Sequence, residues 1–340
     1  MKKSVFTVII TIIITINGYS QQFGNITAID NLLQLYAVSA QNGAQDAEQI
    51  LTGYLSPLMK GIGFGMASGW VNTAATHKPG GFDFSISLNT SFIPVSDYVY
   101  TIGPLKEATL VSPGDGSIPT IFGRNGAPTF QHNITNEYFD GAGGMGFESA
   151  FGSFIPTPMV QAGIGVIPGT DVKIRFMPPL KNTQYGLNVN MLGIGGTHDL
   201  TQYIPDMGDE NFKISAFAGF TRFNFNADLS DAKDKSKTAA FHVNSITVQA
   251  IASKTITIFT LYASGGVTQS LLNTSFKGGY SIDNDPSTIE VTDPLDMTFG
   301  SLGPRGTLGL QMKFIALTMN MDYTFQKYNT LSVGLGISIK

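Results

Sequence analysis

The chain has 340 residues, a formal net charge of −4 and only 13% charged residues. The small negative charge excludes a nucleic-acid partner, which would require a basic face, and the lack of cysteine excludes disulfides, cysteine-ligated metal sites and cysteine nucleophiles. Ordinary soluble domains contain about 25% charged residues, so this composition favours a protein that exposes much apolar surface.

The first 20 residues have the features of a cleavable secretory signal. Lys2 and Lys3 precede an apolar core at 5–16, and small residues at 18–20 form a cleavage region. The alternative is a membrane anchor, but about a dozen apolar residues are too few to span a bilayer comfortably. We therefore expect the mature chain to lie outside the cytoplasm.

Residues 21–60 differ from the rest because their apolar residues recur at helical spacing. Ile29, Leu32 and Leu33 belong to one such set, and Ile50 belongs to a second. We predict one or two short amphipathic helices. Two placements are open relative to the barrel predicted below: an appendage packed outside it, or a plug inside its lumen.

From residue 61 onward, apolar and polar residues alternate with a period of two. In 315–339, for example, Met319 and Met321 share one face while Thr318 and Asn320 share the other. About ten residues with this period suffice for a tilted strand to cross a bilayer. The expected strands are 61–72, 81–93, 159–167, 172–178, 184–193, 212–225, 240–252, 255–269, 271–282, 305–314, 316–327 and 331–339.

A β-sandwich would also alternate, so other features must decide between the two architectures. Beyond the signal, no uninterrupted apolar run approaches the roughly 18 residues of a transmembrane helix. A membrane protein without such a helix must be a closed barrel, because hydrocarbon does not tolerate unpaired strand edges. We predict an all-β membrane barrel, an antiparallel transmembrane β-barrel of about 12–14 strands over 61–340 with a short N-terminal helical element. Segment 94–158 could add two strands, form an outer loop or constrict the lumen.

The connections between these strands fall into two length classes. Those at 168–170 and 313–316 are short, whereas those at 195–211, 230–238 and 283–298 are long and polar. One rim of short turns and one rim of long loops is typical of outer-membrane barrels.

Polar residues on the inward faces form the candidate site. An Arg or Lys facing lipid would cost roughly 2–4 kcal/mol at the bilayer midplane, so these groups require water or a partner. They could line a channel, or they could pair with one another or with the N-terminal helix in a filled lumen. The lumen-lining candidates are Gln161, Lys173, Arg175, Asn188, Asn190, Asn320, Asp322 and Gln326.

No sequence pattern predicts an enzyme. The four histidines, at 77, 132, 198 and 242, are far apart and lack metal-ligand spacing, and nothing adjacent to them marks an activated serine. Walker, dinucleotide-binding and nucleophile-elbow motifs are not found. We expect no catalytic residue, no metal site and no cofactor.

Four segments carry a family resemblance: 54–58 leading into 61–72, 80–83, 158–163 with 168–171, and 323–336. They resemble outer-membrane barrel proteins of Bacteroidota of the DUF6588 type, a family of unknown function. That resemblance implies fold and compartment only. A weaker similarity is to the FadL-like transporters of long-chain fatty acids and aromatic hydrocarbons, in which an N-terminal hatch plugs a fourteen-stranded barrel; no binding residue is carried over from them.

The expected function is passive transport or uptake of a small solute, hydrophobic solutes included, through the outer membrane of a Gram-negative cell. The alternative is a plugged barrel with a structural, adhesive or envelope-complex role. Expected partners are outer-membrane lipid, the solute and the barrel-assembly machinery during biogenesis.

Overall fold

A computed structural model describes residues 42–124, 126–144, 154–182, 187–205, 211–228, 238–284, 287–292 and 295–339. The predicted signal at 1–20 and the first part of the predicted helical segment, 21–41, lie outside the described residues. One helix, α3 (Asn42–Ala67), precedes the barrel strands. These strands are β1 (Phe82–Phe92), β7 (Phe154–Ile167), β8 (Thr170–Asn182), β9 (Leu187–Asp199), β10 (Phe212–Asp228), β11 (Thr238–Ile256), β12 (Phe259–Lys277), β15 (Leu295–Phe314), β16 (Leu317–Phe325) and β17 (Thr330–Ile339).

The barrel is closed and antiparallel, with the strand order β1-β17-β16-β15-β12-β11-β10-β9-β8-β7. Strand β1 completes the ring because Phe82 is opposite Ile339 of β17 on one edge and opposite Ile164 of β7 on the other. The predicted fold class, an antiparallel β-barrel preceded by a short helical element, is confirmed.

The two faces of the wall separate apolar from polar residues as the alternation predicts. In β16, Leu317 and Met321 point outward and are 52% and 55% exposed, whereas Thr318 and Asp322 point inward and are buried. An apolar exterior around a polar interior is the pattern of membrane barrels.

Among the described residues, no helix is both long enough and apolar enough to cross a membrane.

The strand number is ten, not the expected 12–14. Residues 61–72 are not a strand, because α3 continues to Ala67. Residues 255–269 and 271–282 are not two strands, because β12 runs unbroken through most of both. Between 94 and 144, none of the described strands joins the barrel.

The two rims of the barrel differ. Tight turns at Gly169, Thr257 and Ile315, each with a positive φ, define the turn rim, where β1 begins and β17 ends. The opposite loop rim carries the hairpin of β13 (Gly279–Asn284) and β14 (Ser287–Thr292). Residues 200–205, from a connection expected among the long loops, lie at the turn rim because β9 extends to Asp199.

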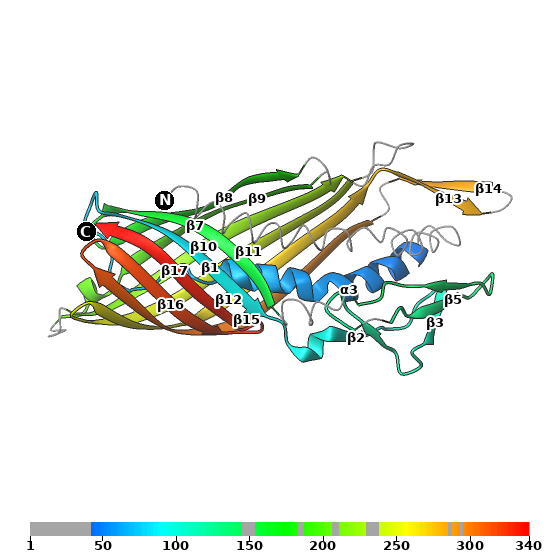
Figure 1. Cartoon of the computed structure of the whole chain (residues 1–340), viewed down its shortest axis with the longest axis horizontal. Helices are drawn as coiled ribbons and strands as arrows, with labels where there is room; N and C mark the ends of the chain where they lie inside the picture. Colours follow the sequence, from blue (N-terminus) through cyan, green and yellow to red (C-terminus); the bar gives the residue numbers. More distant parts are fainter. Residues whose placement is uncertain are drawn as a thin grey trace.

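The wall is also uneven in height. Strand β11 has 19 residues and β16 has 9, which at about 3.3 Å per residue correspond to roughly 60 Å and 30 Å. The long strands β10, β11, β12 and β15 form a tall side that extends past the short strands at the loop rim (Figure 1).

Residues 93–144 form a cap at the loop rim. It contains η1 (Val95–Tyr98), β2 (Val99–Thr101), β3 (Ala108–Ser112), β4 (Ser117–Pro119), β5 (Thr129–His132) and β6 (Tyr138–Asp140). These strands pair in two small sheets, β2-β4 and β3-β5-β6. Figure 1 shows the cap beside the part of α3 that protrudes from the barrel, at the end opposite the C-terminus. Of the described residues in 94–158, those at 94–144 therefore form a loop at this rim outside the ring of barrel strands, whereas 154–158 belong to β7.

Hydrogen bonds fasten the cap to the N-terminal half of α3. The Asp46 carboxylate accepts from the backbone N–H groups of Lys106 and Glu107, and the Tyr100 hydroxyl donates to Ile50 O at 2.7 Å. Burial raises the pKa of Tyr54 to about 12, so its hydroxyl stays protonated and donates to a cap carbonyl, Gly143 O, at 3.2 Å.

Candidate functional site

The C-terminal half of α3 lies inside the barrel, where its glycines allow the backbone to approach the wall. A Cβ added at Gly63 would lie 2.0 Å from Ser270 Oγ on β12, and one added at Gly65 would lie 2.4 Å from Thr157 Oγ1 on β7. Side chains at these positions would collide with the wall. The alternating glycines at 61, 63 and 65, which suggest a strand in the sequence, therefore serve helix–wall packing.

The last four carbonyls of α3 have no partners within the helix, and the surrounding barrel satisfies each of them. Gln326 Nε2 donates to Phe64 O at 3.3 Å, and Asn89 Nδ2 donates to Gly65 O at 3.0 Å. Arg175 Nη1 donates to Met66 O at 2.9 Å, and Arg305 Nη1 donates to Ala67 O at 2.7 Å. These four donors come from β1, β8, β15 and the β16–β17 turn, so they hold the helix end from several sides.

The two arginines also match the helix dipole. A helix C-terminus carries about half a negative charge, and cations there are stabilising. The last turn of α3 contains no basic residue of its own. Arg175 and Arg305, both buried, supply that charge from the wall.

The segment after α3 continues the same set of contacts. Trp70 O accepts hydrogen bonds from Gln161 Nε2 at 3.2 Å and from Lys173 Nζ at 3.4 Å. The Trp70 ring lies 3.8 Å from the Arg175 guanidinium carbon, within range of a cation–π interaction. Gln161 Oε1 accepts from Arg175 Nε at 2.8 Å, so these four side chains and the helix end form one network.

An acidic residue lies in the same buried region. Asp322 on β16 is 3% exposed and accepts a hydrogen bond from the Tyr262 hydroxyl at 2.9 Å. Among the described residues, neither Arg175 nor Arg305 forms an ion pair within 4 Å. The arginines are therefore held by carbonyls, hydroxyls and the Trp70 ring, not by a carboxylate.

Methionines dominate the apolar layer around the lumenal part of α3. Met59 and Met66 of α3 pack with Met159 and Met191 of the wall, and Val243 and Leu272 complete the cluster. Methionine is flexible and adapts to changes in its surroundings. The helix is thus packed, but against side chains that can rearrange.

The wall also presents hydroxyls that α3 does not satisfy. The side-chain oxygens of Thr221, Ser245 and Thr274 are buried and have no hydrogen-bond partner among the described residues. Buried polar groups of this kind are usually bonded to ordered water. This lining suits a hydrated lumen more than a sealed apolar core.

The predicted site residues fall into two groups. Gln161, Lys173, Arg175 and Gln326 gather around the end of α3, and Asp322 is buried near them. The others lie apart from that network. Asn190 Oδ1 accepts from Asn224 on the neighbouring strand at 2.8 Å, Asn188 is half-buried on the same strand as Asn190, and Asn320 is buried on β16 beside Gly334.

Sequence reasoning missed three residues of the network. Arg305 was placed at the boundary of an expected strand, although its alternation with Thr307 and Gln311 marks it as inward-facing. Asn89 belongs to the polar face of β1, which alternation alone does not distinguish from other wall residues. Trp70, the single tryptophan, was assigned to a strand that does not exist.

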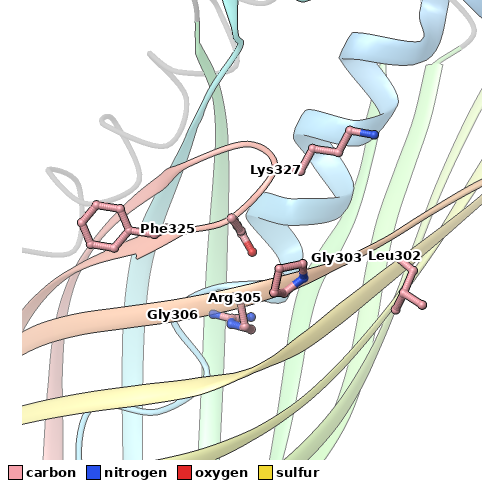
Figure 2. Close-up of a pocket in the computed structure, with 8 residues that line it drawn as sticks. Leu302, Gly303, Arg305, Gly306, Phe325 and Lys327 are labelled. Atoms are coloured by element: carbon pink, nitrogen blue, oxygen red, sulfur yellow. The ribbon is translucent and has the colours of Figure 1, made fainter.

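A pocket of about 420 Å³ opens between β15 and the end of β16. Its lining residues are Leu302, Gly303, Pro304, Arg305, Gly306, Phe325, Gln326 and Lys327. Figure 2 shows α3 passing close to Lys327 behind this opening.

The pocket exists because β15 extends beyond its pairing with the shorter strand β16. Pairing between β15 and β16 covers only Gly306–Phe314 of β15, whereas pairing with β12 begins at Leu295. Pro304 lies in the part of β15 that does not pair with β16. Proline has no N–H to leave unpaired, so it is expected at such a strand edge. We call this opening the side notch.

No group of three or more His, Cys, Asp or Glu side chains in the described part of the chain could hold a metal ion.

A family model described as "Family of unknown function (DUF6588)" matches residues 1–339. The chain belongs to this family. A search among curated proteins found no match.

Solved structures that resemble the chain include three bacterial proteins. Ail, the attachment invasion locus protein of Yersinia pestis, is 8% identical over 77% of this chain and 98% of its own, with a TM-score of 0.28. The outer membrane protease OmpT of Escherichia coli is 9% identical over 78% of this chain and 100% of its own, with a TM-score of 0.34. The translocator domain of the autotransporter NalP of Neisseria meningitidis is 10% identical over 76% of this chain and 88% of its own, with a TM-score of 0.34. At these identities and scores, the resemblance indicates no function for this DUF6588 protein.

Proposed function

We propose that this DUF6588 protein is an outer-membrane barrel for passive passage of a small solute, with α3 acting as a displaceable plug. The apolar exterior supports placement in a lipid bilayer, with membrane lipid as the partner of the wall. Its assembly there would require barrel-assembly machinery, because a closed apolar-faced barrel cannot insert strand by strand without exposing edges.

The observation that carries the proposal is the way in which α3 is held in the lumen. Its last four carbonyls are bound by side-chain donors. Such a bond contributes a net of about 0.5–1.5 kcal/mol for an amide donor and about 1.5–3 kcal/mol for a charged arginine. Hydroxyls without partners line the same lumen, and the apolar contacts are rich in methionine. A helix held by exchangeable hydrogen bonds and by adaptable methionine side chains can leave its seat.

The side notch favours hydrophobic compounds as the class of transported solute. Leu302 and Phe325 at its mouth are 70% and 53% exposed on the outer surface. Behind them lie Gln326 and Arg305, two of the four side chains that hold the end of α3. A solute dissolved in the bilayer would therefore meet the plug directly.

A reversible disulfide that fixes α3 to the wall tests this function. Because the chain has no cysteine of its own, no other disulfide can form within it. A Cβ at Gly65 would lie 3.2 Å from Thr157 Cβ, close to the roughly 3.5–4.5 Å of a disulfide. We expect vesicles containing oxidised Gly65→Cys/Thr157→Cys protein to lose solute uptake relative to wild type, and a reductant to restore it.

Two controls interpret the experiment. Gly65→Cys alone and Thr157→Cys alone should respond to neither oxidant nor reductant. Equal uptake by the locked and reduced forms would refute a moving plug, and no uptake by the wild type would refute passage altogether.

The loop-rim cap favours a second candidate, a plugged barrel that binds a partner at the cell surface. Val95, Ile134 and Tyr138 of the cap are 73%, 66% and 65% exposed, so the cap offers apolar side chains that a partner could cover. Surface binding by wild-type protein without solute uptake would favour this role.

A further inference from the structure

Between α3 and β1, the segment Ser68–Gly81 carries the chain from the lumen to the turn rim. We call this segment the strap. Its His77 lies against the wall, where it contacts Asp171 at the start of β8 and Ser338 near the end of β17. These residues are 94 and 261 positions away from His77 in the sequence.

We propose that Ser338, His77 and Asp171 form a charge-relay site that hydrolyses small water-soluble acyl esters at the turn rim. This activity would be independent of solute passage through the lumen. It rests on the arrangement of the three side chains, because nucleophilic serine catalysis requires a serine, a base and a group that orients the base.

The geometry meets those requirements. Asp171 Oδ2 lies 2.8 Å from His77 Nδ1, and Asp171 Oδ1 accepts the backbone N–H of His77 at 2.9 Å. The carboxylate therefore favours the proton on Nδ1 and fixes the orientation of the ring, which leaves Nε2 as an acceptor. Nε2 lies 3.2 Å from Ser338 Oγ, at the upper end of the range for a nucleophile and its base.

A cation completes the site. Lys313 Nζ lies 3.2 Å from Ser338 Oγ, where it can stabilise the negative charge that forms during attack on a carbonyl. A second carboxylate, Asp83 Oδ1, lies 3.9 Å from His77 Nδ1. It adds to the charge that would stabilise a protonated imidazole.

The orienting pair Asp171 and His77 is buried, whereas the nucleophile Ser338 is accessible, as catalysis requires. Asp171 and His77 are 2% and 8% exposed, so water competes little for their hydrogen bond. Ser338 is only half-buried, so a substrate can reach it.

The substrate class follows from the orientation of β17. Ile337 and Ile339 point outward and are 44% and 49% exposed, so Ser338 between them points inward. Acyl chains on the outer surface of the barrel would not reach its hydroxyl. A small ester entering from the aqueous mouth would meet Ser338 and the charged Lys313.

The reaction balances with water as the only co-reactant. Ser338 Oγ bonds to the ester carbonyl carbon and its proton passes to His77 Nε2, while the carbonyl electron pair moves to oxygen near Lys313. Collapse breaks the bond to the alcohol oxygen, which leaves with the proton from His77. Water then attacks the acyl-serine through the same base, and the acid is released as Ser338 regains its proton.

Covalent labelling of the full chain with a small fluorophosphonate tests the proposal. We expect stoichiometric labelling of the wild type at Ser338, mapped by peptide mass, and hydrolysis of p-nitrophenyl acetate that the label abolishes. Ser338→Ala should eliminate both, and His77→Gln should slow labelling by about 10²-fold or more. Asp171 is a positioning residue, so Asp171→Asn should lower kcat with little change in KM. Asp171→Glu, which keeps a carboxylate, should recover part of the rate.

The matched control is Ser96→Ala, which removes an exposed serine of the cap and should change neither signal. Ser338→Ala leaves the His77–Asp171 hydrogen bonds in place, so a folded variant is expected and circular dichroism checks it. Absence of labelling in folded wild type, or undiminished labelling of Ser338→Ala, would overturn the proposal and leave the three side chains as an anchor for the strap.

Discussion

At the residue scale, the buried arginines show how a charge is accommodated without a carboxylate partner. Arg305 donates to Ala67 O at 2.7 Å and is 6% exposed. Changing Arg305 to Met keeps much of its volume but leaves the carbonyl unsatisfied, which typically costs about 1–3 kcal/mol. We predict a loss of this size in the free energy of unfolding of Arg305→Met, measured by denaturant titration in detergent.

Arg222 provides the comparison, since it is an exposed arginine with a hydrogen bond to Asn224 Oδ1 at 3.1 Å. Arg222→Met should change stability by no more than about 0.5 kcal/mol. Equal effects of the two substitutions would mean that the contact with Ala67 O does not hold the end of α3.

At the element scale, the fit of α3 in the lumen depends on its glycines. A Cβ at Gly63 would already lie 2.0 Å from Ser270 Oγ and 2.8 Å from its Cβ, so a branched side chain there must displace the helix or the wall. Overpacking of this kind costs typically about 1–3 kcal/mol. We predict that Gly63→Val lowers the unfolding midpoint and makes α3 more susceptible to protease.

Gly265 on β12 is the matched position, because a Cβ there meets nothing within 4 Å. Valine suits a strand better than glycine does, so Gly265→Val should leave the midpoint unchanged or raise it slightly. A Gly63→Val protein as stable and protease-resistant as wild type would show that α3 is not packed closely against β12.

At the scale of the whole molecule, the cap and the tight turns lie at opposite ends of one barrel (Figure 1). In outer-membrane barrels, the long loops face the outside of the cell and the short turns face the periplasm. If this DUF6588 protein is such a barrel, Gly114→Cys in the exposed cap should react with an impermeant maleimide on intact cells. Tyr203→Cys, 67% exposed at the turn rim before substitution, should react only after the outer membrane is permeabilised.

The unmodified chain gives no background in this assay, since it contains no cysteine. Labelling of Tyr203→Cys but not Gly114→Cys on intact cells would reverse the orientation. Equal labelling of both would contradict a membrane-spanning barrel.

Local pattern was enough to predict the wall. The alternation in segments such as 316–327 and 331–339 depends only on successive side chains pointing to opposite faces. Strand β16 lies within the first range, and β17 covers the second and begins one residue earlier, at Thr330. Four site residues, Gln161, Lys173, Arg175 and Gln326, could also be picked out because inward polar groups follow from the same period. Where glycine blurred the period, as at 61–72, the prediction was wrong, because a residue without a side chain carries no information about which face it occupies.

The sequence by itself determined that the strands would have one apolar and one polar face, since that division follows from the period of two. Together with the low charge and the lack of a long apolar run, that period indicated a closed antiparallel barrel. Only the tertiary structure decided the strand number, the seating of α3 on Arg175 and Arg305, and the meeting of His77 with Asp171 and Ser338. These depend on pairing register and on contacts between residues up to 261 positions apart, and a local pattern does not encode which distant groups face each other across a lumen.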